Sequence, residues 1–181
     1  MNEIRTKAAK KFREHWTFSS DSEVGGYQKF WIDLLGDVLG VEDATHRISF
    51  QTPVPMAGTT KFLDAWIPET RVLIEHKSRG VKLDAPQSGH GGKTPFQQAL
   101  EYNVARPFSA KARWIVTCNF DEIWVYDMDR PLDDPQKIRL SELPRELAAY
   151  GLLDGRDKRD PPGEPEIVAH LFKLYAEMTK E

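Results

Sequence analysis

The segment KFLDAWIPETRVLIEHK, residues 61–77, decides the fold of this chain. It holds two mostly apolar runs, rich in β-branched and aromatic residues, on either side of a Pro-Glu-Thr sequence that is typical of a turn. Two such runs predict an antiparallel hairpin. With a two-residue turn at the Glu-Thr pair, Asp64 stands directly opposite Glu75. Because side chains alternate along a strand, Asp64, Glu75 and Lys77 would then lie on one face of the hairpin.

Two carboxylates that face each other across a strand pair repel, and the repulsion grows when the site is shielded from water. A positive group should therefore lie between Asp64 and Glu75. A divalent cation that prefers oxygen ligands, Mg²⁺ or Mn²⁺, fits two carboxylates, a main-chain carbonyl and waters. Lys77 could orient or deprotonate a water, or neutralise the charge that develops on a phosphate. This is chemistry suited to the hydrolysis of a phosphodiester.

Two ordinary explanations compete with this chemistry. The pattern Glu-x-Lys is expected ~once by chance in a chain of this size and charge content, and the charges could lie solvated at the edge of a hairpin. The helix predicted after the hairpin carries Gln98 and Tyr102 four residues apart, on one face. Alone, that pair describes an amphipathic helix with a buried tyrosine. Beside the hairpin acids, the amide and the phenol could together approach a phosphate.

The composition limits the class of protein. With 181 residues, 40% of them hydrophobic, the chain can bury one core of ordinary size, so we expect one domain. A net charge of -3 excludes a domain that holds nucleic acid by charge alone, because phosphate binding scales with the Lys and Arg engaged. No apolar run approaches the ~18 residues of a membrane span, and no secretory signal is recognised, so a cytoplasmic location is expected. The lone Cys118 predicts a buried thiol.

Hydrophobic periodicity and turn residues predict the order of the elements. Helices are expected at residues 3–16, 22–39, 96–106 and 141–150, and strands at 46–51, 61–67, 71–77, 112–120, 122–128 and 137–140. This order predicts an α/β domain over residues 1–150, with a central mixed sheet flanked by helices and an N-terminal helical arm. Residues 151–181 are expected to form a polar linker and an amphipathic helix at about 164–179.

These motifs carry a family resemblance. Asp64, Glu75 and Lys77 on consecutive strands, followed by a helix with Gln98 and Tyr102, resemble the PD-(D/E)XK nuclease superfamily. The chain is more closely similar to the N-terminal nuclease domain of MmeI-like restriction enzymes, which fuse endonuclease, adenine methyltransferase and DNA target recognition in one polypeptide. The stretches that carry the likeness are GGYQKFWIDLLGDVLGV, LIEHKSRG, FQQALEYN and WIVTCNFDEIWVYDM. The resemblance implies a restriction-endonuclease-like fold, in which the last helix connects to the methyltransferase.

The resemblance also implies roles for the residues of the motifs. Asp64 and Glu75 would ligate Mg²⁺, for which Mn²⁺ can substitute, with help from the main-chain carbonyl of His76. Lys77 would work beside the attacking water. Gln98 and Tyr102 would position the water or the strand that is cut. Superfamily members often add an acid from the first core helix, and the candidate here is Glu23; an interaction of a helix-start glutamate with the helix dipole explains that residue equally well.

Contacts with DNA are expected from four basic residues around the motif, Lys77, Arg79, Lys82 and Lys93. One departure from the family is Leu63, which stands where the superfamily name has proline. No methyltransferase motif is found, so methyltransferase and target-recognition domains are expected as partners, in the same or a partner chain. One site cuts one strand, so we also expect a transient homodimer on DNA.

The sequence therefore predicts a Mg²⁺-dependent DNA endonuclease domain, the cleavage module of a fused restriction-methyltransferase enzyme. Two other functions stay open at this stage. The chain could be a non-catalytic, nuclease-like module for DNA binding or docking. It could also be a nuclease of DNA repair or one that acts on RNA, since metal-assisted hydrolysis acts on the phosphate rather than the base.

Overall fold

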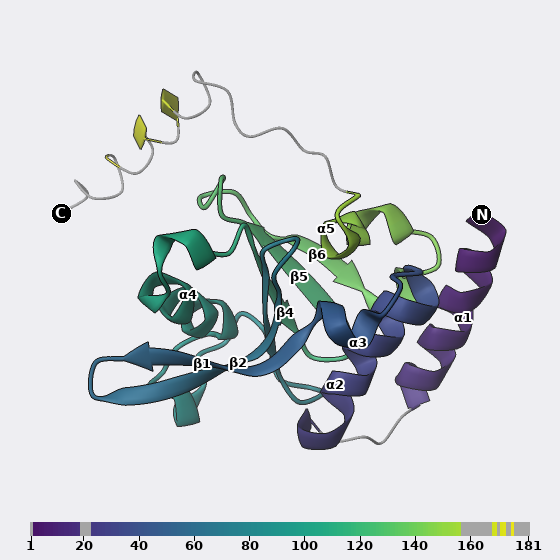
Figure 1. Cartoon of the computed structure of the whole chain (residues 1–181), viewed down its shortest axis with the longest axis horizontal. Coiled ribbons are helices and arrows are strands. Elements are labelled where there is room, and N and C mark those ends of the chain that lie inside the picture. The colour runs from purple at the N-terminus through teal and green to yellow at the C-terminus, as the bar shows by residue number, and fades with distance from the viewer. Residues whose placement is uncertain (1, 19–22, 157–167, 170, 173–174, 176–181) are drawn as a thin grey trace.

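The computed structural model describes residues 2–18 and 23–156, together with 168–169, 171–172 and 175. Across these residues the chain is an α/β protein, in which a six-stranded mixed sheet packs against helices (Figure 1). The fold class expected from the sequence is confirmed. Most of the helix expected at 164–179, and most of the linker before it, lies outside the described residues.

Up to β6 the elements follow the order predicted from the hydrophobic pattern, with shifted ends and with one short helix, α3, that the pattern does not predict. The helices are α1 (Asn2–Phe18), α2 (Glu23–Asp33), α3 (Ala44–Arg47), α4 (Pro95–Ala105) and α5 (Gly151–Asp154). The strands are β1 (Ser49–Met56), β2 (Thr59–Ile67), β3 (Val72–His76), β4 (Trp114–Cys118), β5 (Glu122–Asp127) and β6 (Gln136–Arg139). Among the described residues, no helix is long and apolar enough to cross a membrane.

The strands lie in the sheet in chain order, from β1 to β6. All neighbours are antiparallel except β3 and β4, which run parallel. A parallel pair needs a crossover connection, and the segment that contains α4 supplies it. Strand β1 is longer than expected; it lies at the edge of the sheet, where its Pro53 and Pro55 are tolerated. Helix α4 covers one face of the sheet, and α1 and α2 lie against the other (Figure 1).

Each face of the sheet has its own hydrophobic core. The core on the α1 and α2 face is the larger, and its buried residues include Trp16, Phe30, Trp31, Ile74 and Leu153. The core under α4 is smaller and contains Val54, Leu63, Trp66, Leu73, Ala99, Tyr102, Ala112 and Ile115. Because side chains alternate along β3, Glu75 shares the α4 face with Leu73, while His76 enters the larger core with Ile74.

Helix α1 packs into the larger core rather than extending as a separate arm. The Phe12 and Phe30 rings lie 5.0 Å apart between centroids, and the Trp16 ring stacks on Phe120 at 5.8 Å. Trp16 is only 1% exposed. Burial of large aromatic side chains of this kind makes α1 part of the folded unit.

The helix expected at residues 22–39 is continuous but changes its winding. It is α-helical up to Asp33 and then forms a π-helical turn, Leu34–Val38. In that turn the N–H of Leu39 donates to the carbonyl of Leu34, five residues back, at 3.0 Å. The wider turn keeps its leucine side chains fully buried. Gly40 ends the helix with a left-handed φ of 70°, as the sequence predicts.

The prediction of a helix at residues 141–150 is wrong. The chain instead forms 3-10 turns at Leu140–Glu142 and Leu147–Tyr150, and α5 begins only at Gly151. Pro144 has no N–H to donate to the carbonyl of Leu140, so an α-helical ladder cannot begin there. At Glu146 the backbone then leaves the helical region, with φ -113° and ψ 30°. The packed core continues into α5, where two leucines are buried.

Candidate active site

The hairpin of β2 and β3 has the register that the sequence predicts. Ile67 pairs with Val72, Trp66 with Leu73 and Ala65 with Ile74. The turn between them is closed by the N–H of Arg71, which donates to the carbonyl of Pro68 at 3.3 Å. The next residues along the two strands are Asp64 and Glu75. They therefore lie at the point where the pairing of β2 with β3 stops.

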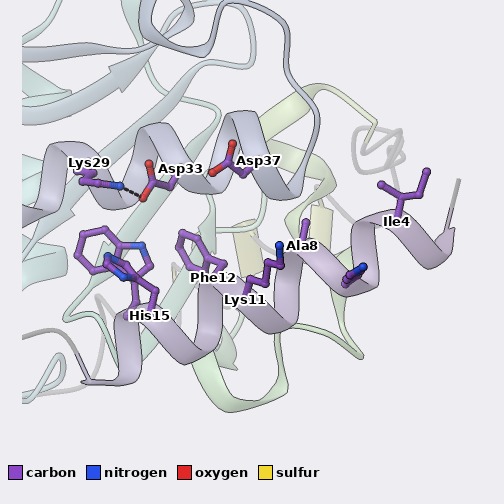
Figure 2. A pocket seen from close by; sticks show the side chains of 10 residues that line it. Ile4, Ala8, Lys11, Phe12, His15, Lys29, Asp33 and Asp37 are labelled. Carbon is purple, nitrogen blue, oxygen red and sulfur yellow. Dashed lines mark hydrogen bonds and ion pairs between the residues drawn. The ribbon is translucent and has the colours of Figure 1, made fainter.

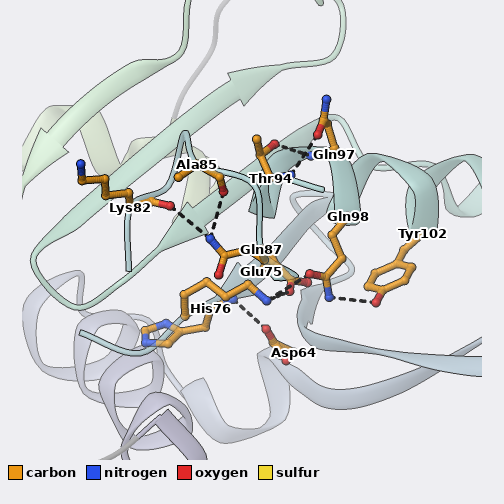
Figure 3. A network of polar contacts seen from close by, with 11 residues as sticks. Asp64, Glu75, His76, Lys82, Ala85, Gln87, Thr94, Gln97, Gln98 and Tyr102 are labelled. Atoms are coloured by element: carbon orange, nitrogen blue, oxygen red, sulfur yellow. Dashed lines mark hydrogen bonds and ion pairs between the residues drawn. The ribbon is translucent and has the colours of Figure 1, made fainter. Parts of the chain in front are cut away.

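Asp64 marks the divergence of the two strands. Its Oδ2 accepts a hydrogen bond from the main-chain N–H of His76 at 2.7 Å. The next N–H, that of Lys77 directly after β3, donates in the other direction, to the carbonyl of Cys118 at 2.7 Å. A side-chain carboxylate thus takes a donor that a neighbouring strand would otherwise bind. Asp64 is half-buried and shares the α4 side of the sheet with Glu75 (Figure 3).

Glu75 and Lys77 form a buried ion pair. The Nζ atom of Lys77 lies 2.7 Å from Oε1 of Glu75 and donates to Oε1 of Gln98 at 3.1 Å. Glu75 is 1% exposed and Lys77 5% exposed. Burial of two charges costs free energy that only close pairing and further hydrogen bonds offset, and both are present here. The protein itself therefore supplies a positive charge beside Glu75.

Helix α4 brings an amide and a phenol to the same place. Thr94 caps the helix: its hydroxyl accepts from the N–H of Gln97 at 3.2 Å, and Pro95 occupies the first turn. This start fixes the face that Gln98 presents to β3. Nε2 of Gln98 donates to the hydroxyl of Tyr102 at 2.9 Å. The contacts thus run from Glu75 through Lys77 and Gln98 to Tyr102. Figure 3 shows Glu75, Gln98 and Tyr102 close together.

The phenol of Tyr102 stays protonated. Burial raises its pKa, the hydrogen bond from Gln98 lowers it, and the nearby charges of Glu75, Asp64 and Glu101 raise it further. The charges of Glu75 and Asp64 both act in the same direction on the pKa of this hydroxyl. A protonated phenol that already accepts from Gln98 still has its own proton to donate. Tyr102 can therefore offer a hydrogen bond to an anionic group at the site.

His76 lies between Glu75 and Lys77 in sequence but on the opposite face of β3. Its ring meets the edge of the Phe120 ring at 4.3 Å, and its Nδ1 accepts from Nε1 of Trp31 at 3.2 Å. Burial, and secondarily the charge of Lys77, lower the pKa of His76 to about 3. The imidazole is therefore neutral, with its proton on Nε2. Its ring serves the core, and only its main chain reaches the acids.

The donor set fits a magnesium ion. The described residues contain no group of three or more His, Cys, Asp and Glu side chains placed to hold a metal. Mg²⁺ does not need such a group, since it keeps several waters and binds through one or two carboxylates together with phosphate oxygens of a substrate. Asp64 and Glu75, from adjacent strands, supply two carboxylates. All-oxygen ligands of this kind suit Mg²⁺ or Mn²⁺ better than softer metals.

The four basic residues predicted to contact DNA differ in burial and in the ion pairs that they already form within the chain. Lys77 is buried in the site, so its position suits a role at the reacting phosphate. Arg79 pairs with Asp121 and donates to the main-chain carbonyl of Trp16, which ties α1 to the turn after β4. Nζ of Lys93 lies 2.6 Å from Oε2 of Glu101, on α4. Lys82 is exposed. The remaining candidate acid, Glu23, is the first residue of α2, and its role stays a prediction.

A pocket of about 580 Å³ lies elsewhere, between α1 and α2 (Figure 2). Its α1 wall carries basic residues, among them Lys7 and Lys11, and its other wall carries Asp33 and Asp37. An ion pair joins Lys29 to Asp33 within it. None of the residues that line this pocket belongs to the cluster on β2, β3 and α4. The pocket is therefore separate from the candidate active site.

Comparison with known protein families gives a match over most of the chain. The family described as MmeI, N-terminal domain, matches residues 7–181. No curated protein and no solved structure matches the chain. The matched range contains all of the candidate site residues.

Proposed function

This chain belongs to the family of MmeI N-terminal domains, the nuclease domains of MmeI-type restriction enzymes, and from this premise we propose that it is a Mg²⁺-dependent DNA endonuclease module. The observation that carries the proposal is the position of Asp64 and Glu75 directly after the last pair of β2 with β3, with Asp64 bound to the N–H of His76 and Lys77 paired with Glu75. The family implies a nuclease; the metal, the reaction and the roles of the residues are our proposal.

Asp64 and Glu75 would hold the metal ion, together with the main-chain carbonyl of His76. A bound Mg²⁺ or Mn²⁺ would supply Lewis-acid stabilisation of the phosphate and lower the pKa of a bound water. The hydrogen bond from the N–H of His76 fixes one oxygen of Asp64. The orientation of this carboxylate is therefore set by the protein before any ion binds, which reduces the cost of ordering the site.

Lys77 would act at the reacting phosphate. Its ammonium has three N–H donors, and its contacts with Glu75 and Gln98 use two of them. We assign the third to the attacking water or to a phosphate oxygen. Charge stabilisation of this kind is worth most in a site shielded from water, and Lys77 is 5% exposed.

Gln98 and Tyr102 would position the substrate. Gln98 links Lys77 to Tyr102, since its oxygen accepts from the lysine and its nitrogen donates to the phenol. The proton of Tyr102 is then directed to a phosphate oxygen of the strand that is cut. A network in which each member fixes the next limits the rotamers of all three side chains.

DNA would be brought to this site by other parts of the enzyme. The net charge of -3 gives the chain little attraction for DNA of its own. Family membership implies a DNA substrate and fused methyltransferase or recognition parts. We propose that such domains, in the same or a partner chain, deliver the module to its substrate, and that two copies meet transiently on DNA to cut both strands.

A plasmid-nicking assay tests the proposed reaction. Supercoiled DNA is incubated with the chain and Mg²⁺, Mn²⁺ or a chelator, and a labelled RNA strand is tested in parallel. We expect metal-dependent nicking of DNA that is lost in Glu75→Gln and kept in Glu69→Gln, a matched exchange at an exposed acid in the turn of the same hairpin. Equal nicking by Glu75→Gln would contradict the assignment. DNA binding without nicking by the unaltered chain would instead favour a docking module.

A further inference from the structure

Gln51 has an unusual backbone conformation and lies opposite Asp64 in the sheet. It lies on β1, is exposed, and has a left-handed φ of 51°. Few residues other than glycine adopt such a conformation, and fewer still within a strand. The pairs Phe50 with Ala65 and Thr52 with Leu63 flank it. In this register Gln51 stands opposite Asp64, and the ladder of the described hairpin skips that one pair.

The interruption at Gln51 is not a β-bulge, because the register is the same on both sides and no residue is inserted. It changes the direction of the side chains instead. Residues two apart on a regular strand share a face, yet Leu63 is buried in the core under α4 and Ala65 in the core on the opposite face. The same switch separates Val54 from Phe50 on β1. The hairpin therefore rotates at Gln51 and Asp64.

A side-chain bond holds Gln51 in place. Its Nε2 donates to the hydroxyl of Tyr27, on α2, at 2.9 Å. The ring of Tyr27 is itself fixed between Phe50 and His76, with centroids 5.7 Å from each. The rotation of the hairpin is thus anchored to the larger core, next to the residue whose N–H binds Asp64.

We propose that Gln51 is a positioning residue for the metal site: its left-handed backbone turns β2 so that Asp64 leaves the regular ladder and reaches the end of β3. This rests on the proposed function, since it assigns Asp64 to a metal ion. The carboxylate of Asp64 then accepts the N–H of His76 and stands on the same side as Glu75. The sequence alone does not predict this role, because glutamine is not a residue type that favours a positive φ.

Three variants separate the backbone of Gln51 from its side chain. Gln51→Val strongly disfavours a positive φ and removes the amide. Gln51→Gly removes the amide but adopts a positive φ freely. Tyr27→Phe removes the hydrogen bond and leaves the backbone of residue 51 unchanged. The matched control is Asp43→Val, at a second exposed residue with left-handed backbone, φ 52°, whose side chain makes no capping bond.

Two measurements on the full chain read out the proposal. Calorimetric titration with Mn²⁺ alone gives metal affinity, and amide hydrogen exchange at His76 reports the bond to Asp64. For Gln51→Val we expect a loss of affinity of about tenfold or more, as for other residues that orient a ligand, and faster exchange at His76. Gln51→Gly should stay within about twofold of the unaltered chain in both readouts. Tyr27→Phe and Asp43→Val should do the same.

The outcomes distinguish the two levels of the proposal. If the unaltered chain binds Mn²⁺ and Gln51→Val binds it equally well with unchanged exchange at His76, the role of Gln51 is wrong and the proposed function stands. If Gln51→Gly is as impaired as Gln51→Val, the side chain matters instead of the backbone, and the proposal is overturned. If the unaltered chain binds no Mn²⁺, the metal site itself is wrong.

Discussion

The carboxylate of Asp64 accepts the main-chain N–H of His76 at 2.7 Å, at the residue where β2 ceases to pair with β3. This bond joins the two strands that carry the acidic residues. Because side chains alternate along the chain, His76 sends its ring into the larger core while its neighbours Glu75 and Lys77 face α4. The site is thus built on the rigid centre of the sheet.

The ion pair of Glu75 with Lys77 predicts that substitutions of these two residues have strongly non-additive effects on the free energy of unfolding. Lys77→Met should lower the free energy of unfolding by about 3–5 kcal/mol, because it leaves a buried carboxylate without its counter-ion. Adding Glu75→Gln to that variant should recover most of the loss, although the double variant is expected to be inactive. Urea unfolding of the two single variants and the double variant measures the coupling. Additive losses would contradict the pairing.

Removal of the Tyr102 hydroxyl should affect turnover more than metal binding. Tyr102→Phe is expected to lower the rate of cleavage by at least about tenfold, because it removes a donor to the phosphate. Affinity for Mn²⁺ should stay nearly unchanged. The control is Tyr126→Phe, at a half-buried tyrosine stacked on Phe96 at 3.9 Å. Single-turnover cleavage and calorimetry check both variants; a loss of equal size in Tyr126→Phe would remove the special role of Tyr102.

The neutral state of His76 predicts a dependence of stability on pH. Its pKa is about 3 in the folded chain and near 6.5 when unfolded, so the unfolded state binds more protons between these values. The contribution is fully present above the unfolded pKa and falls as the pH drops toward the folded one. Between about pH 7.5 and about pH 5.5 the unaltered chain should lose about 1.4 kcal/mol more than His76→Phe.

His76→Phe keeps the ring packing but leaves Nε1 of Trp31 without its acceptor. It should therefore be less stable than the unaltered chain at neutral pH, by about 1–3 kcal/mol. The test is the difference in slope between the two chains, measured by urea unfolding at each pH. Parallel pH profiles would show that another group controls acid stability.

The packing of α1 predicts that the first helix is needed for folding. Trp16→Ala should lower the free energy of unfolding by about 3–5 kcal/mol, since it empties a fully buried site between Phe30 and Phe120. Phe18, two residues along the same helix, is 85% exposed. Phe18→Ala should change stability by less than about 0.5 kcal/mol. Denaturant titration of both variants measures these changes. If both variants lose little stability, and by similar amounts, the helix is only loosely attached and the prediction is wrong.

The sequence predicts those parts of the structure that depend on local pattern. The apolar runs around the Pro68 turn fix the register of β2 with β3, and the spacing of Gln98 and Tyr102 places both on one face of α4. The acids and Lys77 could be named from the same pattern. Their roles remain predictions, whereas their positions at the ends of β2 and β3 are a property of the fold.

Other features depend on contacts that pattern does not encode. Pro144 and the backbone of Glu146 replace the helix expected at residues 141–150 with 3-10 turns. The burial of Lys77 against Glu75 is a tertiary contact, and a basic residue after a strand could equally have been solvated. The left-handed backbone of Gln51 has no signal in sequence at all, since glutamine is not a residue type that favours a positive φ.

The most direct test of the account is the position of a bound metal ion. A crystal of the chain soaked in Mn²⁺ should show one strong anomalous difference peak at the ends of β2 and β3, about 2.1 Å from a carboxylate oxygen of Asp64 and of Glu75. The peak should vanish in Glu75→Gln and persist in Glu69→Gln. A peak that avoids both acids, or no peak under conditions in which the chain nicks DNA, would contradict the site.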